Sequence, residues 1–125
     1  MNTASDIVRA YLAAMEARDL ETAKSFLAPG FTMIFPGDVH LGSLEELIAW
    51  AKDRYARVGK TFDAFDEMTH DGKDIVYCHG ALNGEWLDGT EFSGIRFIDR
   101  FTLMNGKLIH HQVWNDLGEI LAARR

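Results

Sequence analysis

The sequence lacks several features that define whole classes of protein. Its 125 residues include one cysteine, Cys78, so no disulfide can form within the chain. No apolar run approaches the ~20 residues that a membrane-spanning helix needs. Basic residues are also few, 13 against 19 acidic ones, which gives a net charge of −6. This balance argues against a nucleic-acid partner or an anionic membrane surface, because both require a basic face.

From the sequence we expect neither a signal peptide nor a second domain. The first residues, MNTASDIVRAY, have neither a basic start nor an uninterrupted apolar stretch. Together with the lone cysteine, this predicts a cytoplasmic location. There is no repeat, linker or low-complexity segment, and the length suits a single hydrophobic core. We therefore expect one domain over residues 1–125.

Apolar residues recur at helical spacing in the first half of the chain. This spacing predicts three helices: one over 5–19 capped by Ser5 or Asp6, a short one from Asp19 to a stop at Pro29-Gly30, and one over 44–58. Ser43 and Glu46 form a capping box at the start of the third helix, and Gly59 ends it.

The remainder of the sequence is predicted to be extended. A short strand, FTMIF, turns at PGD and returns as VHL, and four longer strands follow the third helix over about 62–69, 74–86, 91–104 and 107–116. The Asp-Gly pairs in HDGK and LDGT and the Asn-Gly pair in MNGK are typical of hairpin turns. Helices followed by hairpin-linked strands predict an α+β fold whose sheet bends around the helices.

Asp99 is the strongest anomaly in this pattern. Strand alternation puts it on a face that is otherwise apolar, between Phe97 and Phe101. A buried carboxylate must be paired or functional. If MNG is a three-residue loop, Asp99 lies opposite His111, and if Asn-Gly is a two-residue turn, it lies opposite Gln112. We favour the first register because it places Ile109 and Val113 inside.

A buried pair of Asp99 and His111 has two interpretations. Burial raises the pKa of a carboxyl group and a protonated imidazole lowers it, and either outcome leaves a proton exchangeable near neutral pH for acid–base catalysis. Alternatively, the two side chains satisfy each other and only fix the strand register. The residues alone leave both interpretations open.

Other candidate residues have structural interpretations. His110 and His111 are adjacent on a strand and point to opposite faces, so they cannot chelate one ion, and no metal site is expected. Cys78 is expected to face inward as a small hydrophobic residue. The outer sheet face is expected to carry Tyr77, His79 and Trp114, and exposed aromatic residues favour a protein partner.

Two segments carry a resemblance to a known family. IVRAYLAAMEARDLETAKSFLAPGFTM resembles the opening helix pair and first strand of the nuclear transport factor 2-like superfamily, and FIDRFTLMNGKLIHHQVWND resembles its closing hairpin. Within the superfamily, the chain is most similar to the SnoaL-like proteins and more distantly to the ketosteroid isomerases. The resemblance implies a cystatin-like, cone-shaped α+β barrel, with three helices of the N-terminal half packed on a strongly curved antiparallel or mixed sheet. It also implies a homodimer formed through the outer sheet face.

The resemblance also implies roles for single residues. Tyr11 and Asp99 stand where ketosteroid isomerases keep their two oxyanion donors, whereas Phe35 stands where they keep the base, and Asp38 falls in a turn. His111 matches a histidine of the SnoaL-like polyketide cyclases, whose aspartate two positions later is replaced by Val113. The candidate catalytic residues are therefore Tyr11, Asp99 and His111, without a cofactor.

These observations predict a pocket for a small apolar molecule. Its expected lining residues are Met15, Phe35, Trp50, Tyr55, Phe97, Phe101, Val113 and Asn115. One hypothesis is a cofactor-independent isomerase, cyclase, dehydratase or hydrolase acting on a small apolar carbonyl compound. In it Asp99 and His111 transfer the proton, Tyr11 polarises the oxygen and Asn115 orients the substrate. A non-catalytic binding protein and a structural dimer with a collapsed pocket are the alternatives.

Overall fold

The computed structural model describes residues 3–124. The elements along the chain are α1 (Ala4–Glu16), α2 (Leu20–Lys24), β1 (Leu27–Phe35), β2 (Val39–Leu41), α3 (Leu44–Lys52), β3 (Arg57–His70), β4 (Lys73–Glu85), β5 (Glu91–Met104), β6 (Lys107–Asn115) and α4 (Leu117–Ala123). The strands form a six-stranded sheet in the order β2-β1-β6-β5-β4-β3. The neighbours are antiparallel except β1 and β6, which run parallel.

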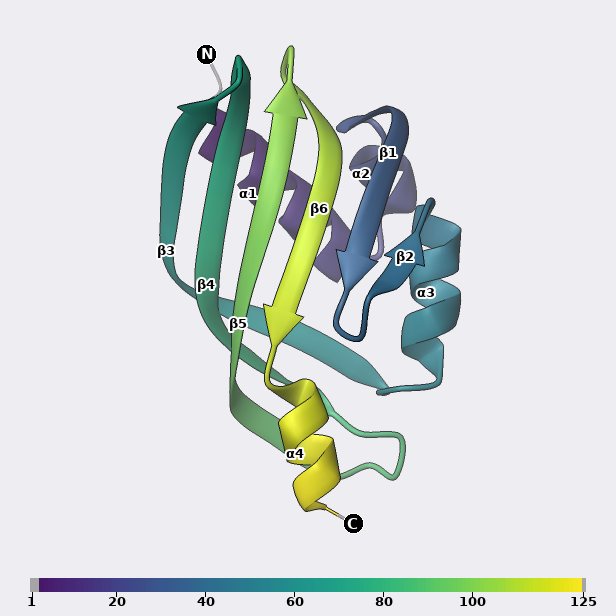
Figure 1. Ribbon diagram of the computed structural model, residues 1–125. Helices are drawn as coiled ribbons and strands as arrows, with labels where there is room; N and C mark the ends of the chain where they lie inside the picture. Colours follow the sequence, from purple (N-terminus) through teal and green to yellow (C-terminus); the bar gives the residue numbers. More distant parts are fainter. Residues whose placement is uncertain (1–2, 125) are drawn as a thin grey trace.

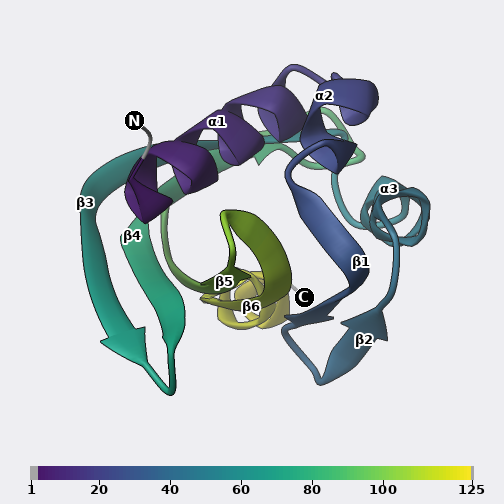
Figure 2. The same cartoon turned by 90° about the horizontal axis from the view of Figure 1, so that it is seen from above.

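The sheet bends strongly, and α1 lies across its concave side (Figure 1). Seen from above, the strands curl beneath α1, and α3 stands next to β1 and β2 (Figure 2). This arrangement confirms the predicted fold class, an α+β cone with three helices in the N-terminal half and a curved mixed sheet. Helix α4 was not predicted from the sequence.

No helix within residues 3–124 is long and apolar enough to cross a membrane.

Helix α1 is positioned by its cap and by its apolar face. The Thr3 hydroxyl accepts a hydrogen bond from the Asp6 N–H, and the Asp6 carboxylate accepts one from the Thr3 N–H, both at 3.1 Å. This reciprocal box makes Thr3 the N-cap, so the predicted caps, Ser5 and Asp6, were wrong by two or three residues. The buried face carries Val8, Tyr11 and Ala14, which turns Tyr11 toward the sheet.

The other predicted helix ends were also too late. Helix α2 starts after Asp19 as predicted but ends at Lys24, and Pro29-Gly30 belongs to β1. Ser43 caps α3 by accepting a 3.1 Å hydrogen bond from the Glu46 N–H. However, the Glu46 carboxylate accepts from Gly42, so the predicted capping box is only half formed.

Helix α3 ends at Lys52, although Tyr55 and Val58 continue its apolar spacing. From Arg57 onward the chain pairs with β4 instead, beginning opposite Glu85. The long β3–β4 ladder overrides the local helical preference. Tyr55 therefore lies between α3 and β3, and Val58 lies on a strand.

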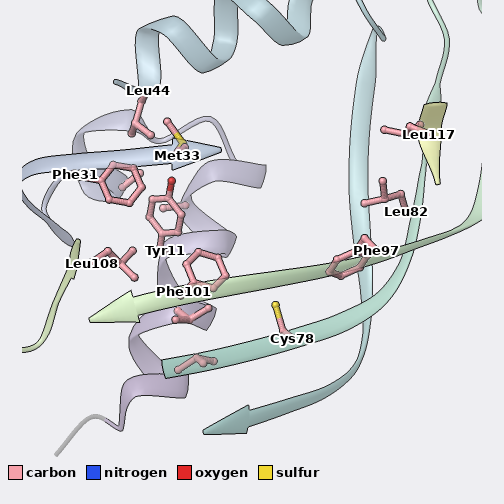
Figure 3. Packing of buried hydrophobic residues seen from close by; sticks show 14 of the residues in the cluster. Tyr11, Phe31, Met33, Leu44, Cys78, Leu82, Phe97, Phe101, Leu108 and Leu117 are labelled. Carbon is pink, nitrogen blue, oxygen red and sulfur yellow. The ribbon is translucent and has the colours of Figure 1, made fainter. Parts of the chain in front are cut away.

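The hydrophobic core lies between α1 and the concave sheet face. Tyr11, Phe31 and Phe101 lie together beneath α1, whereas Leu82, Phe97 and Leu117 gather toward α4 (Figure 3). Tyr11 meets Phe31 and Phe101 edge-on, with ring centroids 6.5 and 6.1 Å apart. Such edge-to-face pairs fix ring orientation as well as burying apolar area.

Neither of the two predicted registers of the β5–β6 hairpin is correct. Asn105 and Gly106 form a two-residue turn with φ of 51° and 75°, and Ile109 is an extra residue on β6 just beyond it. This bulge shifts the pairing, so Asp99 lies opposite Val113 and His111 lies opposite Phe101. The prediction that His111 and Val113 face the interior is nevertheless confirmed, since both are buried.

Candidate functional site

A cavity of about 290 Å³ lies between α1, α3 and the concave sheet face. Its walls include Tyr11, Met15, Phe35, Tyr55, Lys60 and His111. A second cavity of about 50 Å³ adjoins it and is lined by Trp50, Phe97, Asp99, Val113 and Asn115, among others. Phe35, Tyr55, Val58 and Lys60 line both cavities, so these side chains separate one from the other.

The structure thus gathers most of the predicted site residues around two adjoining spaces. Tyr11 and His111 reach the larger cavity and Asp99 reaches the smaller. Phe101 is the exception among the predicted lining residues. It is fully buried and stacks on the His111 ring at 4.0 Å between centroids, so it supports the imidazole from behind.

Asp99 is fully buried and bound to Lys60, which was not among the predicted site residues. Lys60 Nζ donates a 2.5 Å hydrogen bond to Asp99 Oδ2, and His111 Nε2 lies 3.6 Å from the same oxygen. The second carboxylate oxygen, Oδ1, has no hydrogen-bond partner within residues 3–124. An unpaired buried acceptor is unfavourable, so a hydrogen bond donated to this oxygen by a ligand or by water would be stabilising.

Burial and neighbouring charges act in opposite directions on the pKa values of Asp99 and His111. Burial would raise the pKa of Asp99, but the Lys60 ammonium and the neighbouring His111 outweigh burial and hold this pKa below its ordinary value. Burial lowers the pKa of His111, and the Asp99 charge offsets this only in part. At neutral pH, Asp99 is therefore ionised and His111 is a neutral imidazole.

His111 has the environment of a proton acceptor. Its ring is held between Phe101 and Phe35, whose centroid lies 5.8 Å away, and both ring nitrogens lack hydrogen-bond partners among the described residues. A neutral imidazole without a partner at a cavity wall can accept a proton from a bound molecule. The 3.6 Å contact with Asp99 would stabilise the imidazolium that results.

Tyr11 is placed to donate a hydrogen bond into the cavity. Its ring centroid lies 6.4 Å from that of His111. Burial, assisted by the Asp99 charge, raises the pKa of Tyr11 above its ordinary value. The hydroxyl therefore stays protonated across the physiological range, as a donor to an oxygen that gains negative charge must.

Lys60 could have been found from its strand alternation. Val58, Lys60 and Phe62 alternate along β3 and all face the larger cavity. The third helix was predicted to end at Val58 and the next strand to begin at residue 62, so Lys60 was assigned to the loop between them. Its ammonium also lies 4.8 Å from the centre of the Phe97 ring, which adds a cation–π contact.

Several other predicted residues have structural roles. Asp38 is exposed in the β1–β2 turn and contacts His40 at 2.8 Å, away from both cavities. Asn115 Oδ1 accepts a 3.1 Å hydrogen bond from the Leu117 N–H, so this oxygen holds the start of α4. Cys78 is buried opposite Asp99, and burial and that carboxylate raise the pKa of the thiol to about 12.

The outer sheet face carries the remaining predicted residues. His110 faces outward and its Nδ1 lies 2.9 Å from the Thr32 hydroxyl, while His111 faces inward. Trp114 is 44% exposed and pairs across the ladder with Ile98, which is 39% exposed. His79 pairs with Ile98 from the other side. Tyr77 accepts a 3.2 Å hydrogen bond from Arg100.

Comparison with known proteins agrees with this architecture. Residues 8–111 match the model of the SnoaL-like domain. The chain belongs to the SnoaL-like domain family. A search of curated proteins found no match.

Solved structures of the same fold cover nearly the whole of this SnoaL-like chain. An NTF2-like protein of unknown function from Burkholderia pseudomallei is 19% identical, with 98% of this chain and 97% of that chain covered and a TM-score of 0.77. TerC, co-crystallised with polyporic acid, is 19% identical, with 95% of each chain covered and a TM-score of 0.77. A protein named as a candidate SnoaL-like polyketide cyclase from Jannaschia sp. is also 19% identical, with 96% and 90% covered and a TM-score of 0.71. At these identities the likeness shows the shared fold.

The buried histidine predicts a loss of stability in mild acid. Because the pKa of His111 is lowered in the folded state, the unfolded chain binds this proton first, and stability falls as the pH drops below about 6.5. We expect a slope of up to about 1.4 kcal/mol per pH unit from this residue. The half-buried His110, whose pKa burial also lowers, adds a smaller part.

Urea denaturation at pH 7.0 and pH 5.5 tests this prediction. His111→Gln should remove most of the difference in midpoint between the two pH values. His70→Gln, at an exposed position beside the β3–β4 turn, is the matched control and should keep the wild-type difference. If the urea midpoint changes by the same amount between pH 7.0 and pH 5.5 in the wild type and in His111→Gln, the prediction is wrong.

Proposed function

We propose that the larger cavity binds a small, mostly apolar carbonyl compound, and that His111 and Asp99 transfer a proton on it without a cofactor. The observation that carries the proposal is a set of buried polar atoms, Asp99 Oδ1 and both His111 ring nitrogens, that have no hydrogen-bond partner within residues 3–124 and belong to residues lining the two cavities. Apolar cavities with a few convergent polar groups are the usual form of small-molecule sites.

The proposed chemistry follows from the protonation states. Neutral His111 accepts a proton from the carbon next to the carbonyl group, so the C–H bond breaks and its electron pair forms the enolate. The Tyr11 hydroxyl donates a hydrogen bond to the enolate oxygen, and Asp99 stabilises the imidazolium. Return of the proton to a different carbon completes an isomerisation. Alternatively, the enolate carbon attacks a second carbonyl within the substrate, and the alkoxide that forms takes the proton back from the His111 imidazolium, which completes a cyclisation.

Solvent deuterium exchange tests proton transfer without knowledge of the natural substrate. In D₂O, the wild-type protein should accelerate deuterium incorporation next to the carbonyl of 2-tetralone, measured by proton NMR. His111→Gln should reduce the enzymatic rate by roughly 10²–10⁴-fold. Tyr11→Phe should reduce it as well, and His70→Gln should leave it unchanged.

Two other outcomes favour the alternative functions. If 2-tetralone raises the melting temperature but its exchange matches that in buffer, the chain is a binding protein and the catalytic proposal is wrong. If neither effect is seen with 2-tetralone or with other small ketones, the polar cluster is structural. The Lys60–Asp99 ion pair is the observation that favours this structural alternative, because it partly satisfies the buried carboxylate.

We also propose that the outer sheet face joins two copies of the chain. The support is the exposed apolar pair Ile98 and Trp114 on adjacent strands, since tryptophan is enriched at the centres of interfaces. In sedimentation experiments the wild type should be a dimer and Trp114→Arg should be a monomer at the same concentration. Met104→Arg, at an exposed position beside the hairpin turn, should remain dimeric. A monomeric wild type would refute this proposal.

A further inference from the structure

Phe35 lies at the boundary of the two cavities and lines both of them. Side chains alternate along a strand, so Phe31, Met33 and Phe35 share the inward face of β1. Met33 pairs with His111 across the parallel β1–β6 ladder. Phe35 is the next inward-facing residue and the last residue of β1, which brings its ring beside the imidazole.

Two ring contacts locate the Phe35 ring more closely. Its centroid lies 5.8 Å from that of His111 and 5.1 Å from that of Trp50, and both contacts are edge-on. His111 lines the larger cavity but not the smaller, whereas Trp50 lines the smaller cavity but not the larger. A ring that contacts one residue particular to each cavity lies between the cavities. Phe35 therefore forms the β1 side of the partition.

The Phe35 ring is held in this position from both ends. His111 is stacked on Phe101 at 4.0 Å between centroids, and the Arg54 guanidinium lies 4.5 Å from the centre of the Trp50 ring. Phe35 thus completes a row of contacts that runs from β5 across β6 and β1 to α3. Edge-to-face contacts fix ring orientation, so Phe35 cannot turn aside without losing contacts on both sides.

The smaller cavity behind Phe35 is suited to extend the larger one. Its volume of about 50 Å³ is far below that of an independent ligand site. Its two opposite charges, Asp99 and Lys60, are paired with each other at 2.5 Å. Apolar side chains supply much of the remaining wall and do not line the larger cavity: Leu82, Phe97, Val113 and Leu117.

We propose that Phe35 determines the length of ligand that the site accepts, because its ring closes the larger cavity beside His111 and keeps the ligand out of the smaller one. This inference rests on the proposed function and specifies which carbonyl compounds fit: those whose apolar body is contained in about 290 Å³. A smaller side chain at position 35 joins the two cavities. Longer compounds then gain apolar contacts with residues such as Leu82 and Val113.

A series of straight-chain methyl ketones from 2-pentanone to 2-undecanone tests this proposal by calorimetric titration. While the chain stays within the cavity, each added methylene group should tighten binding by about fourfold. In the wild type this gain should stop at an intermediate length, and in Phe35→Ala it should continue to longer ketones. The variant should therefore bind 2-undecanone at least about tenfold more tightly than the wild type does. Phe35→Leu, which removes less of the side chain, should show a smaller gain in the same direction.

The double variant Phe35→Ala/Val113→Met is the matched control. Val113 lines the smaller cavity but not the larger, so a longer side chain at this position refills the extension that Phe35→Ala opens. The affinity for 2-undecanone should return toward the wild-type value. If Phe35→Ala acted only by making the larger cavity roomier, the gain would survive in the double variant.

The possible results separate this inference from the proposed function. If the ketones bind but the gain stops at the same length in the wild type and in both single variants, or if the double variant keeps the gain, the inference about Phe35 is wrong and ligand binding still stands. If no ketone of the series binds the wild type at concentrations up to about 1 mM, and 2-tetralone also has no effect, both proposals are overturned. Should Phe35→Ala fail to fold, Phe35→Leu decides between the same outcomes.

Discussion

Lys60→Met is expected to lower the free energy of unfolding by about 3–5 kcal/mol, because it leaves a buried carboxylate without its partner. Asp99 has no exposed surface, whereas the Lys60 side chain is 22% exposed. Asp99→Asn should therefore cost less than Lys60→Met, since water can reach the ammonium that remains. Urea midpoints at constant m-value measure both changes.

The double variant Lys60→Met/Asp99→Asn separates the ion pair from other effects of substitution. Removing both charges leaves no buried ion, so the double variant should be less destabilised than the sum of the single variants by about 1–3 kcal/mol. Lys52→Met, at an exposed position on α3, should change stability by less than about 0.5 kcal/mol. Additive single-variant effects would show that Lys60 and Asp99 are not coupled.

Gly80→Ala is expected to destabilise the protein by more than about 4 kcal/mol or to prevent folding. A Cβ atom built on Gly80 would lie 1.9 Å from the carbonyl oxygen of Thr61, which is backbone and cannot rotate away. The clash forces β3 off β4 next to Lys60, so the ion pair with Asp99 is displaced as well.

Gly118→Ala is the matched control for this prediction. A Cβ atom on Gly118 meets nothing within 4 Å, and the residue lies in α4. Alanine should therefore be neutral or should stabilise the protein by up to about 1 kcal/mol. Thermal unfolding of both variants gives the comparison, and a Gly80→Ala protein within 1 kcal/mol of the wild type would contradict the close approach of β3 to β4.

Strand alternation predicted correctly that Asp99, His111 and Val113 face inward, but it also placed Ile109 inside, and Ile109 is a half-buried bulge residue. The period of two around Phe97 and Phe101 was enough to place Asp99 inside the protein. The register failed because Ile109 bulges out of the β5–β6 ladder, and one extra residue leaves no mark in an apolar pattern. The contact between Asp99 and His111 nevertheless forms, diagonally rather than directly across the strands.

Lys60 was missed at the site for a related reason. Tyr55 and Val58 follow the helical period of α3, so the sequence favours a longer helix there. The hydrogen bonds that convert this segment into a strand come from β4, more than twenty residues further along the chain. The local sequence pattern does not reveal the pairing with β4. The start of β3 was therefore predicted too late, and Lys60 was not predicted as a site residue.

The position of β6 governs when this protein can complete its fold. β6 is the last strand made, yet it lies between β1 and β5 in the sheet. A chain emerging from the ribosome with its N-terminus first can form the β3–β4–β5 hairpins from neighbouring segments, but β1 has no partner beyond β2 until residues 107–115 are synthesised. During that interval the backbone N–H and C=O groups along the edges of β1 and β5 that later pair with β6 are open to other chains. Because His111 arrives with this same strand, the walls of the cavity are completed by the last step of sheet assembly.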